Sequence, residues 1–173
     1  MSQKIAVVGA GFIGRSWAMV FSKAGHHVSL YDIDPAALSE AMNLLEINIA
    51  DLESNGLISS KDDLLGRIQP YKTLEGAVEE AEWVQENALE NVQIKRELFS
   101  RMDELLPETT ILASSTSAIP CSDISNGMKG AGRIIVAHPA NPPYLLPIVE
   151  LSGAPETKDE TIFRAKELLE AAD

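Results

Sequence analysis

The stretch AVVGAGFIGRSWAMVF, residues 6–21, joins a short apolar run to a segment of helical periodicity by way of three glycines. Gly9, Gly11 and Gly14 form the pattern G-x-G-x-x-G. In this pattern the first glycine permits a tight turn, the second lets backbone approach a diphosphate, and the third lets the helix pack closely on the strand. The first helical residues, Phe12 and Ile13, then offer free N–H groups to the phosphates. The alternative is a glycine-rich turn that binds no ligand.

Apolar runs and helical patterns alternate along the rest of the chain. Expected strands lie at residues 4–9, 27–34, 68–71, 83–86, 109–116, 132–140 and 146–152. Expected helices lie at residues 12–25, 35–56, 60–68, 91–106 and 158–172. The helix at 91–106 has apolar residues at Val92, Ile94, Leu98, Met102 and Leu105. This alternation predicts an α/β protein with a Rossmann-type, doubly wound, mostly parallel sheet and helices on both faces, and we expect residues 1–173 to form a single dinucleotide-binding domain.

Asp32 ends the second expected strand and decides which dinucleotide the site would take. A carboxylate in this place accepts hydrogen bonds from the adenine ribose. It would repel a 2′-phosphate, since two charges ~4 Å apart at an effective dielectric of ~20 interact by ~4 kcal/mol. No arginine follows in YDIDPAALSE, residues 31–40, to offset this repulsion. The sequence therefore favours NAD over NADP. The alternative, a turn or N-cap aspartate, is better filled by Asp34, which precedes Pro35.

Composition excludes several classes of partner. The chain has 26 acidic and 14 basic residues, a net charge of −12, which disfavours nucleic acid and anionic membranes. No apolar run is long enough to span a bilayer, and the first residues lack the layout of a signal peptide. Cys121 is the single cysteine, so no disulfide forms within the chain. We expect a cytoplasmic protein with no metal site, whose partner is a small molecule.

Polar residues that suit proton transfer follow the strands of the second half. His138 comes directly after the apolar run RIIVA, and Glu150 lies inside the next apolar run. A buried carboxylate needs a partner, and paired with His138 it would fix the imidazole tautomer and stabilise the imidazolium. Such a base takes a proton from a substrate hydroxyl while hydride leaves the same carbon. Ser117 and Asn141 would hydrogen-bond the reacting oxygen. Each residue also has a structural alternative: a satisfied histidine, a solvated strand-end glutamate, a turn serine and a pre-proline asparagine.

These segments resemble the 3-hydroxyacyl-CoA dehydrogenase superfamily over essentially the whole chain. The resemblance is carried by LENVQIK at 89–95, SSTS at 114–117, HPAN at 138–141 and the glutamate downstream. Within the superfamily the chain is most similar to the branch of lambda-crystallin and L-gulonate 3-dehydrogenase, through GRSWAMVF at 14–21, LYDID at 30–34 and VAHPANPPYLLPIVEL at 136–151.

The resemblance implies a role for each candidate residue. His138 would be the general base and Glu150 its partner. Ser117 would contact both the substrate oxygen and the nicotinamide, and Asn141 would help to hold the substrate. Two further residues, Glu90 and Lys95, would lie near the nicotinamide ribose; the alternative for them is a solvated pair at a helix start.

Two departures from the superfamily bear on the substrate. The acyl-CoA enzymes usually have asparagine where this chain has Ser115, and phenylalanine where it has Pro139. Both differences favour a small, polar L-3-hydroxy acid similar to L-gulonate, with L-carnitine a near neighbour, over a long acyl-CoA. The alternatives are an L-3-hydroxyacyl-CoA dehydrogenase of fatty acid metabolism and a non-enzymatic NAD-binding protein like the crystallins. A methyltransferase is disfavoured by Gly14.

Family members also continue into a helical C-terminal domain that completes the substrate pocket and the dimer. This chain ends at Asp173, before such a domain. The resemblance therefore implies a homodimer for the longer form. We expect the chain as given to bind NAD and to turn over substrate weakly or not at all.

Overall fold

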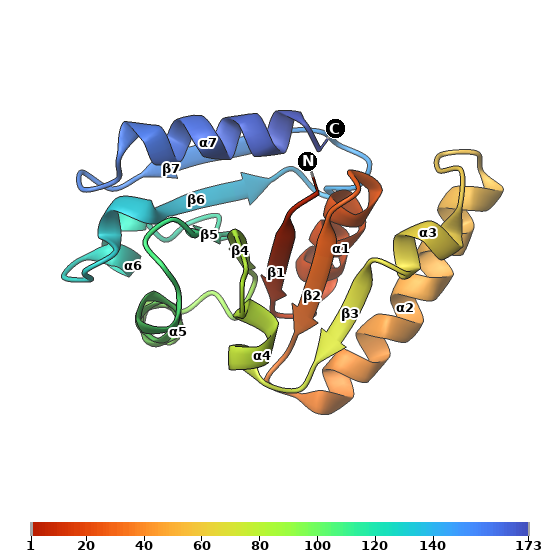
Figure 1. Cartoon of the computed structure of the whole chain (residues 1–173), viewed down its shortest axis with the longest axis horizontal. Helices are drawn as coiled ribbons and strands as arrows, with labels where there is room; N and C mark the ends of the chain where they lie inside the picture. Colours follow the sequence, from red (N-terminus) through yellow and green to blue (C-terminus); the bar gives the residue numbers. More distant parts are fainter. Residues whose placement is uncertain (1, 173) are drawn as a thin grey trace.

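A seven-stranded sheet runs through the computed structural model, which describes residues 2–172. The strands are β1 (Lys4–Val8), β2 (His27–Tyr31), β3 (Ile68–Tyr71), β4 (Trp83–Glu86), β5 (Ile111–Ser114), β6 (Ile134–Pro139) and β7 (Val149–Gly153). Their order is β3-β2-β1-β4-β5-β6-β7 (Figure 1). The first six strands are parallel and β7 pairs with β6 antiparallel. This is the doubly wound order that the sequence predicts, with an antiparallel strand added at one edge.

Helices cover both faces of the sheet. They are α1 (Phe12–Lys23), α2 (Pro35–Ser54), α3 (Lys61–Leu65), α4 (Leu74–Val78), α5 (Val92–Leu105), α6 (Cys121–Ser125) and α7 (Asp159–Glu170), with a 3₁₀ turn at Ala131–Arg133. One apolar core lies between the sheet and the helices α1, α2, α3 and α7, and another lies under α4, α5 and α6. The sequence did not predict α4 or α6, since a five-residue helix shows little helical periodicity. The equally short α3 was predicted, within residues 60–68.

Local capping explains where the main helices begin and end. Asp34 Oδ1 accepts a hydrogen bond of 2.9 Å from the Ala36 N–H, and Pro35 is the first residue of α2. Asn91 caps α5 in the same way. Gly25, at φ +89°, ends the turn that follows α1 in a conformation that favours glycine. These signals confirm the helix limits expected from the sequence to within a few residues.

The buried face of α5 differs from the expectation. Val92 and Ile94 are each 39% exposed, whereas Lys95, Phe99 and Met102 are buried. A hydrophobic pattern cannot identify this face, because Lys95 occupies a core position and forms an ion pair there with the buried Glu86. Apolar residues near the start of α5 are therefore left on the solvent side.

The strand order reverses direction between β1 and β4. From β1 the chain first builds outward through β2 and β3, and it then returns to build β4, β5 and β6 on the other side (Figure 1). Open α/β sheets bind ligands at the carboxyl ends of the strands beside such a reversal. The glycine turn after β1 and the residues that follow β2, β4, β5 and β6 all lie at this edge.

Candidate functional site

The three glycines of the first turn are required for different reasons. Gly9 has φ +95°, and a Cβ there would lie 2.7 Å from the carbonyl carbon of Asn87. A Cβ on Gly14 would collide with the Gly9 carbonyl oxygen. At Gly11, by contrast, a Cβ would meet no described atom within 4 Å. The fold itself therefore demands Gly9 and Gly14, whereas Gly11 leaves an open space of the kind that a diphosphate needs.

The N-terminus of α1 is open to an anion. Gly11 is its N-cap, no side chain caps it among the described residues, and its first turn carries no acidic residue. The N–H groups of Phe12 and Ile13 therefore remain available at the positive end of the helix dipole. Arg15 adds a cation, since its Nη1 lies 3.3 Å from the Ala10 carbonyl oxygen. Arg15 was not among the predicted site residues, although its place directly after the third glycine was a signal.

Asp32 holds the glycine turn in place through hydrogen bonds, and it lies beside that turn with lone pairs to spare. Its Oδ2 accepts a hydrogen bond of 2.7 Å from the Ala10 N–H, and its Oδ1 accepts one of 2.9 Å from the Asp34 N–H. Each carboxylate oxygen keeps a further lone pair that can accept a ribose hydroxyl. The residues of the turn thus fit a dinucleotide, with backbone N–H groups for the diphosphate and a carboxylate for the adenine ribose.

A buried ion pair supports the loop after β4. Glu86 and Lys95 are 0% and 1% exposed, and Lys95 Nζ lies 2.7 Å from Glu86 Oε1. Glu86 also accepts hydrogen bonds from the Ala88 N–H and from the Ser114 hydroxyl, each at 2.6 Å. Lys95 is therefore not the solvated residue of the alternative interpretation, and it lies beneath the loop. Glu86 was missed, although a carboxylate that ends the apolar strand WVQE was visible in the sequence.

Glu90 fixes the loop that carries Ser117. Its Oε1 accepts hydrogen bonds from the Thr116 hydroxyl at 2.5 Å, the Ser117 N–H at 3.1 Å and the Ala118 N–H at 3.3 Å. Its Oε2 lies 3.7 Å from Lys95 Nζ. Burial alone would raise the pKa of Glu90, but these hydrogen bonds and the Lys95 charge outweigh it and hold the pKa below its ordinary value. Glu90 therefore stays ionised at neutral pH.

Ser115 joins the first helix to strands β4 and β6. Its Oγ accepts hydrogen bonds from Trp17 Nε1 at 3.0 Å and Gln85 Nε2 at 2.7 Å, and it donates one to Asn87 Oδ1 at 2.7 Å. Gln85 Nε2 also lies 3.3 Å from the Ala137 carbonyl oxygen, next to His138 in the chain. The Ser115 hydroxyl thus has its donor and both acceptor positions filled inside the protein. The serine that replaces the usual asparagine is used in this network. This difference from the superfamily therefore no longer supports a small substrate.

His138 and Glu150 face each other across the antiparallel pair β6 and β7. They are register partners, and His138 Nδ1 lies 2.9 Å from Glu150 Oε2. The expectation that Glu150 is buried was wrong, because its side chain is 79% exposed and that of His138 is 31% exposed. The reason is that β7 is the last strand of the sheet, where an apolar run in the sequence does not imply cover on both sides.

Ser117 and Asn141 lie at the same edge of the sheet as His138. Ser117 follows β5, Asn141 follows β6, and both are exposed. Within residues 2–172, the hydrogen bond that joins members of the predicted catalytic set is the one between His138 and Glu150. The fold therefore gathers the set along one edge without linking all its members.

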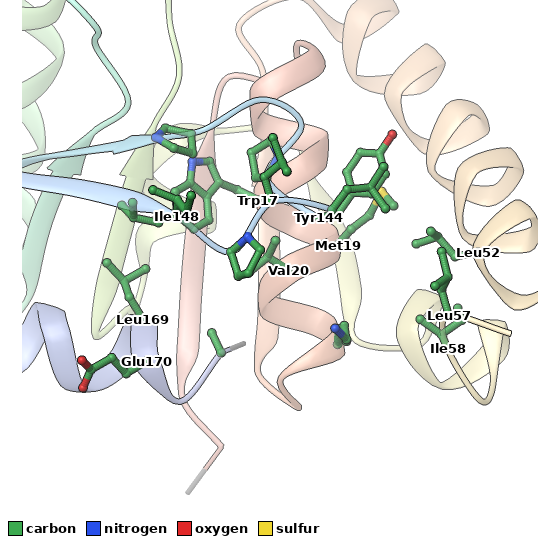
Figure 2. Close-up of a pocket in the computed structure, with 18 of the residues that line it drawn as sticks. Trp17, Met19, Val20, Leu52, Leu57, Ile58, Tyr144, Ile148, Leu169 and Glu170 are labelled. Atoms are coloured by element: carbon green, nitrogen blue, oxygen red, sulfur yellow. The ribbon is translucent and has the colours of Figure 1, made fainter. Parts of the chain in front are cut away.

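An apolar groove of about 650 Å³ lies apart from these polar residues (Figure 2). Trp17, Met19 and Val20 of α1 form one side, Tyr144 and Ile148 of the loop before β7 form another, and Leu169 of α7 adds to it. Pro139 lines the groove, but His138 and Glu150 are not among its described lining residues. This groove is thus a neighbour of the candidate active site and not the site itself.

Comparison with known proteins gives the family. Residues 4–173 match the family described as 3-hydroxyacyl-CoA dehydrogenase, NAD binding domain. The chain belongs to this family. Its cofactor is NAD, as the carboxylate after β2 predicts.

Relatives of the 3-hydroxyacyl-CoA dehydrogenase domain agree in sequence and in fold. The lambda-crystallin homolog of Bos taurus is 40% identical over 168 residues, which is 95% of this chain and 52% of that protein. The L-carnitine dehydrogenase of Streptomyces griseus is 39% identical over 155 residues, 90% of this chain and 46% of that protein. The structure of 3-hydroxybutyryl-CoA dehydrogenase from Escherichia coli K12 is 28% identical, with a TM-score of 0.95 over 99% of this chain and 37% of that one.

The chain spans about half the length of the curated relatives it matches. The family match over residues 4–173 includes β6 and β7, the strands of His138 and Glu150. Within residues 2–172 no helix is both long and apolar enough to cross a membrane.

Proposed function

We propose that the protein is an NAD-dependent dehydrogenase that oxidises the C3 carbinol of a small L-3-hydroxy acid, similar to L-gulonate in size and polarity. The observation that carries this proposal is the contact of 2.9 Å between His138 Nδ1 and Glu150 Oε2 at the carboxyl edge of the sheet. The pair lies on the β4–β5–β6 side of the glycine turn. In a doubly wound sheet that is the side opposite the adenosine half of a bound dinucleotide.

We infer the route of proton transfer from the geometry of the pair. Because Nδ1 donates its hydrogen to Glu150, Nε2 of His138 carries a free lone pair and takes the proton of the substrate hydroxyl. The imidazolium that forms is stabilised by the Glu150 carboxylate and then releases its proton to water. Bound NAD would supply the acceptor for the hydride that leaves C3, so that the alcohol becomes a ketone.

The other candidates serve binding and orientation. Ser117 and Asn141 hydrogen-bond the reacting oxygen of the substrate, and Ser117 also faces the nicotinamide. Glu90 holds the backbone of Ser117 in place. Lys95, being 1% exposed, acts through Glu90 and the loop above it and does not itself contact the cofactor.

Exposure of the pair limits its strength in this chain. A carboxylate that is 79% exposed is surrounded by water and salt, which screen its charge and weaken its direct contact with His138. We propose that residues 1–173 form the dinucleotide-binding domain of a longer, homodimeric enzyme whose second part covers the pair and excludes water. On its own, the chain should bind NAD and turn over slowly.

Two observations favour the small L-3-hydroxy acid. The first is Pro139, which follows the base directly and has a compact side chain that also lines the apolar groove. L-carnitine, named in the relative from Streptomyces griseus, is itself a small 3-hydroxy acid. The alternative, an L-3-hydroxyacyl-CoA substrate, is favoured by the similarity to 3-hydroxybutyryl-CoA dehydrogenase. A non-enzymatic role is suggested by the name of the lambda-crystallin homolog.

The test compares these substrates in one assay of NADH formation, with L-gulonate, L-carnitine and L-3-hydroxybutyryl-CoA. It is run on the chain as given and on a fusion to the second half of the bovine lambda-crystallin homolog. We expect turnover of the small acids by the fusion and weak turnover by the chain alone. A strong preference for the CoA thioester would establish the alternative substrate. NAD binding with no turnover in either form would favour the non-enzymatic role.

A further inference from the structure

Three charged side chains meet at the carboxyl ends of β4 and β5, and one of them is left unbalanced. The buried Glu86 and Lys95 form an ion pair at 2.7 Å, so their opposite charges cancel for a group that lies outside the pair. Glu90 lies 3.7 Å from the same Lys95 Nζ and is 44% exposed. The group as a whole therefore presents a net negative charge, and the Glu90 carboxylate is its solvent-facing part.

Topology places this carboxylate on the nicotinamide half of the dinucleotide site. Asp32 follows β2, on one side of β1, and is the residue that suits the adenine ribose. β4 and β5 lie on the other side of β1, across the reversal in strand order. A dinucleotide with its diphosphate at the glycine turn extends from the first side to the second. Its nicotinamide therefore reaches the loops after β4 and β5, which carry Glu90 and Ser117.

We propose that Glu90 sets the relative affinity of the site for the two redox forms of the cofactor, favouring NAD⁺ over NADH. The nicotinamide ring carries a positive charge in NAD⁺ and none in NADH, whereas the rest of the two molecules is the same. A fixed carboxylate on this side attracts the charged ring and leaves the neutral one unaffected. Only such a difference in interaction can shift the balance between two ligand forms.

Three features make Glu90 suited to this role. Its Oε1 is held by three donors from residues 116–118, so the carboxylate has a fixed position. Those same donors keep its pKa low, so the charge persists at neutral pH. Its Oε2 has Lys95 as neighbour, but the Lys95 charge is already opposed by Glu86. The proposal rests on the dinucleotide site and does not depend on which substrate the enzyme takes.

The test is the ratio of the dissociation constants of NADH and NAD⁺, measured by titration of the chain without substrate. Glu90→Gln keeps an oxygen that can accept from Thr116, Ser117 and Ala118, and it removes the charge. For a partly exposed carboxylate we expect the dissociation constant of NAD⁺ to rise roughly 3- to 10-fold while that of NADH changes less than about twofold. The matched control is Glu97→Gln, an exposed glutamate on α5, which makes the same charge change away from the site and should leave the ratio unchanged.

An unchanged ratio of the two dissociation constants in Glu90→Gln would overturn the proposal. If NAD⁺ and NADH both bound more weakly by the same factor, Glu90 would only position the loop. If Glu90→Gln does not fold, the wild-type chain provides the second measurement. Salt screens a charge–charge interaction but not a shape, so the preference for NAD⁺ should fall as ionic strength rises, and a constant ratio would contradict the proposal. A ratio shift together with failure to oxidise 3-hydroxy acids would leave this inference standing and remove the proposed substrate.

Discussion

The two halves of the site are built differently. On the cofactor half, backbone packing fixes Gly9 and Gly14, and Asp32 holds the Ala10 N–H at 2.7 Å. On the substrate half, His138 pairs with a glutamate that is 79% exposed on the edge strand β7. Contacts within this chain hold the first half in place. In the second half the glutamate is exposed to water, where an ion pair contributes little free energy. Cofactor binding should therefore be intrinsic to this domain, and efficient proton transfer should depend on whatever covers the edge.

The largest expected effect is that of replacing His138, which should lower turnover without changing NAD binding. In His138→Gln the side chain can still hydrogen-bond but cannot act as a base near neutral pH. Turnover should fall by roughly 10²–10⁴-fold, the usual contribution of general base catalysis. It is measured in the fusion, where we expect the second half to cover the pair. The dissociation constant of NAD should stay the same, and an unchanged rate would remove His138 from the mechanism.

The next largest effect is a loss of NAD affinity in a chain that still folds. Gly11→Val puts a branched side chain into open space, so the melting temperature should hardly change. NAD affinity should fall by at least about 100-fold, equivalent to about 3 kcal/mol, because the diphosphate loses its place. Gly14→Ala is the contrasting variant, since its Cβ collides with the Gly9 carbonyl and should destabilise the fold itself. If Gly11→Val binds NAD normally, the cofactor lies elsewhere.

The difference between the halves also decides what the sequence could predict. Gly9 and Gly14 belong to the first strand–turn–helix unit, Asp32 and the capping residue Asp34 belong to the next, and local spacing identified them. Other contacts left no such signal. Glu86 and Lys95 are nine residues apart, in a strand and in the helix that follows it, and no single periodicity links them. The exposure of Glu150 follows from the position of β7 in the sheet.

Ser115 illustrates how a local comparison can mislead. Comparison of one motif suggested that a serine at this position favours a small, polar substrate. Its hydroxyl is instead used by Trp17, Gln85 and Asn87, which come from α1 and from the end of β4. Only the folded arrangement brings these four residues together.

A moderate effect is expected where this network joins the two halves. Ser115→Ala leaves the indole N–H of Trp17 buried without its acceptor, which should cost about 1–3 kcal/mol of unfolding free energy. Trp17→Phe removes that donor. The double variant should therefore lose less than the sum of the single losses in chemical denaturation. Strict additivity would indicate that the Trp17–Ser115 hydrogen bond contributes nothing.

The smallest effect lies outside both halves and concerns pH. His26 is buried, and its Nδ1 accepts a hydrogen bond of 3.1 Å from the Gln3 N–H. Burial lowers the pKa of His26 below its ordinary value of 6.5. The unfolded chain thus takes up a proton at a higher pH than the folded chain, so stability is full above about pH 6.5 and declines as the pH falls below it.

The measurement compares the free energy of unfolding at about pH 7.5 and about pH 5.5, where carboxylates stay ionised. Wild type should lose up to about 1.4 kcal/mol for each pH unit below the unfolded-state pKa, until the folded-state pKa is reached. His26→Gln should lose less of its stability over this range. His27→Gln is the matched control, because His27 is exposed, and it should behave as wild type. Identical slopes in all three would mean that His26 titrates alike in both states.

Both proposals require that this chain by itself builds an NAD site. A crystal structure of the 173-residue chain with NAD tests this requirement directly. We expect the diphosphate at the open face of Gly11, within reach of the Phe12 and Ile13 N–H groups, and the adenine ribose on Asp32. A dinucleotide bound instead in the apolar groove beside Trp17 and Tyr144, with the glycine turn unused, would contradict it.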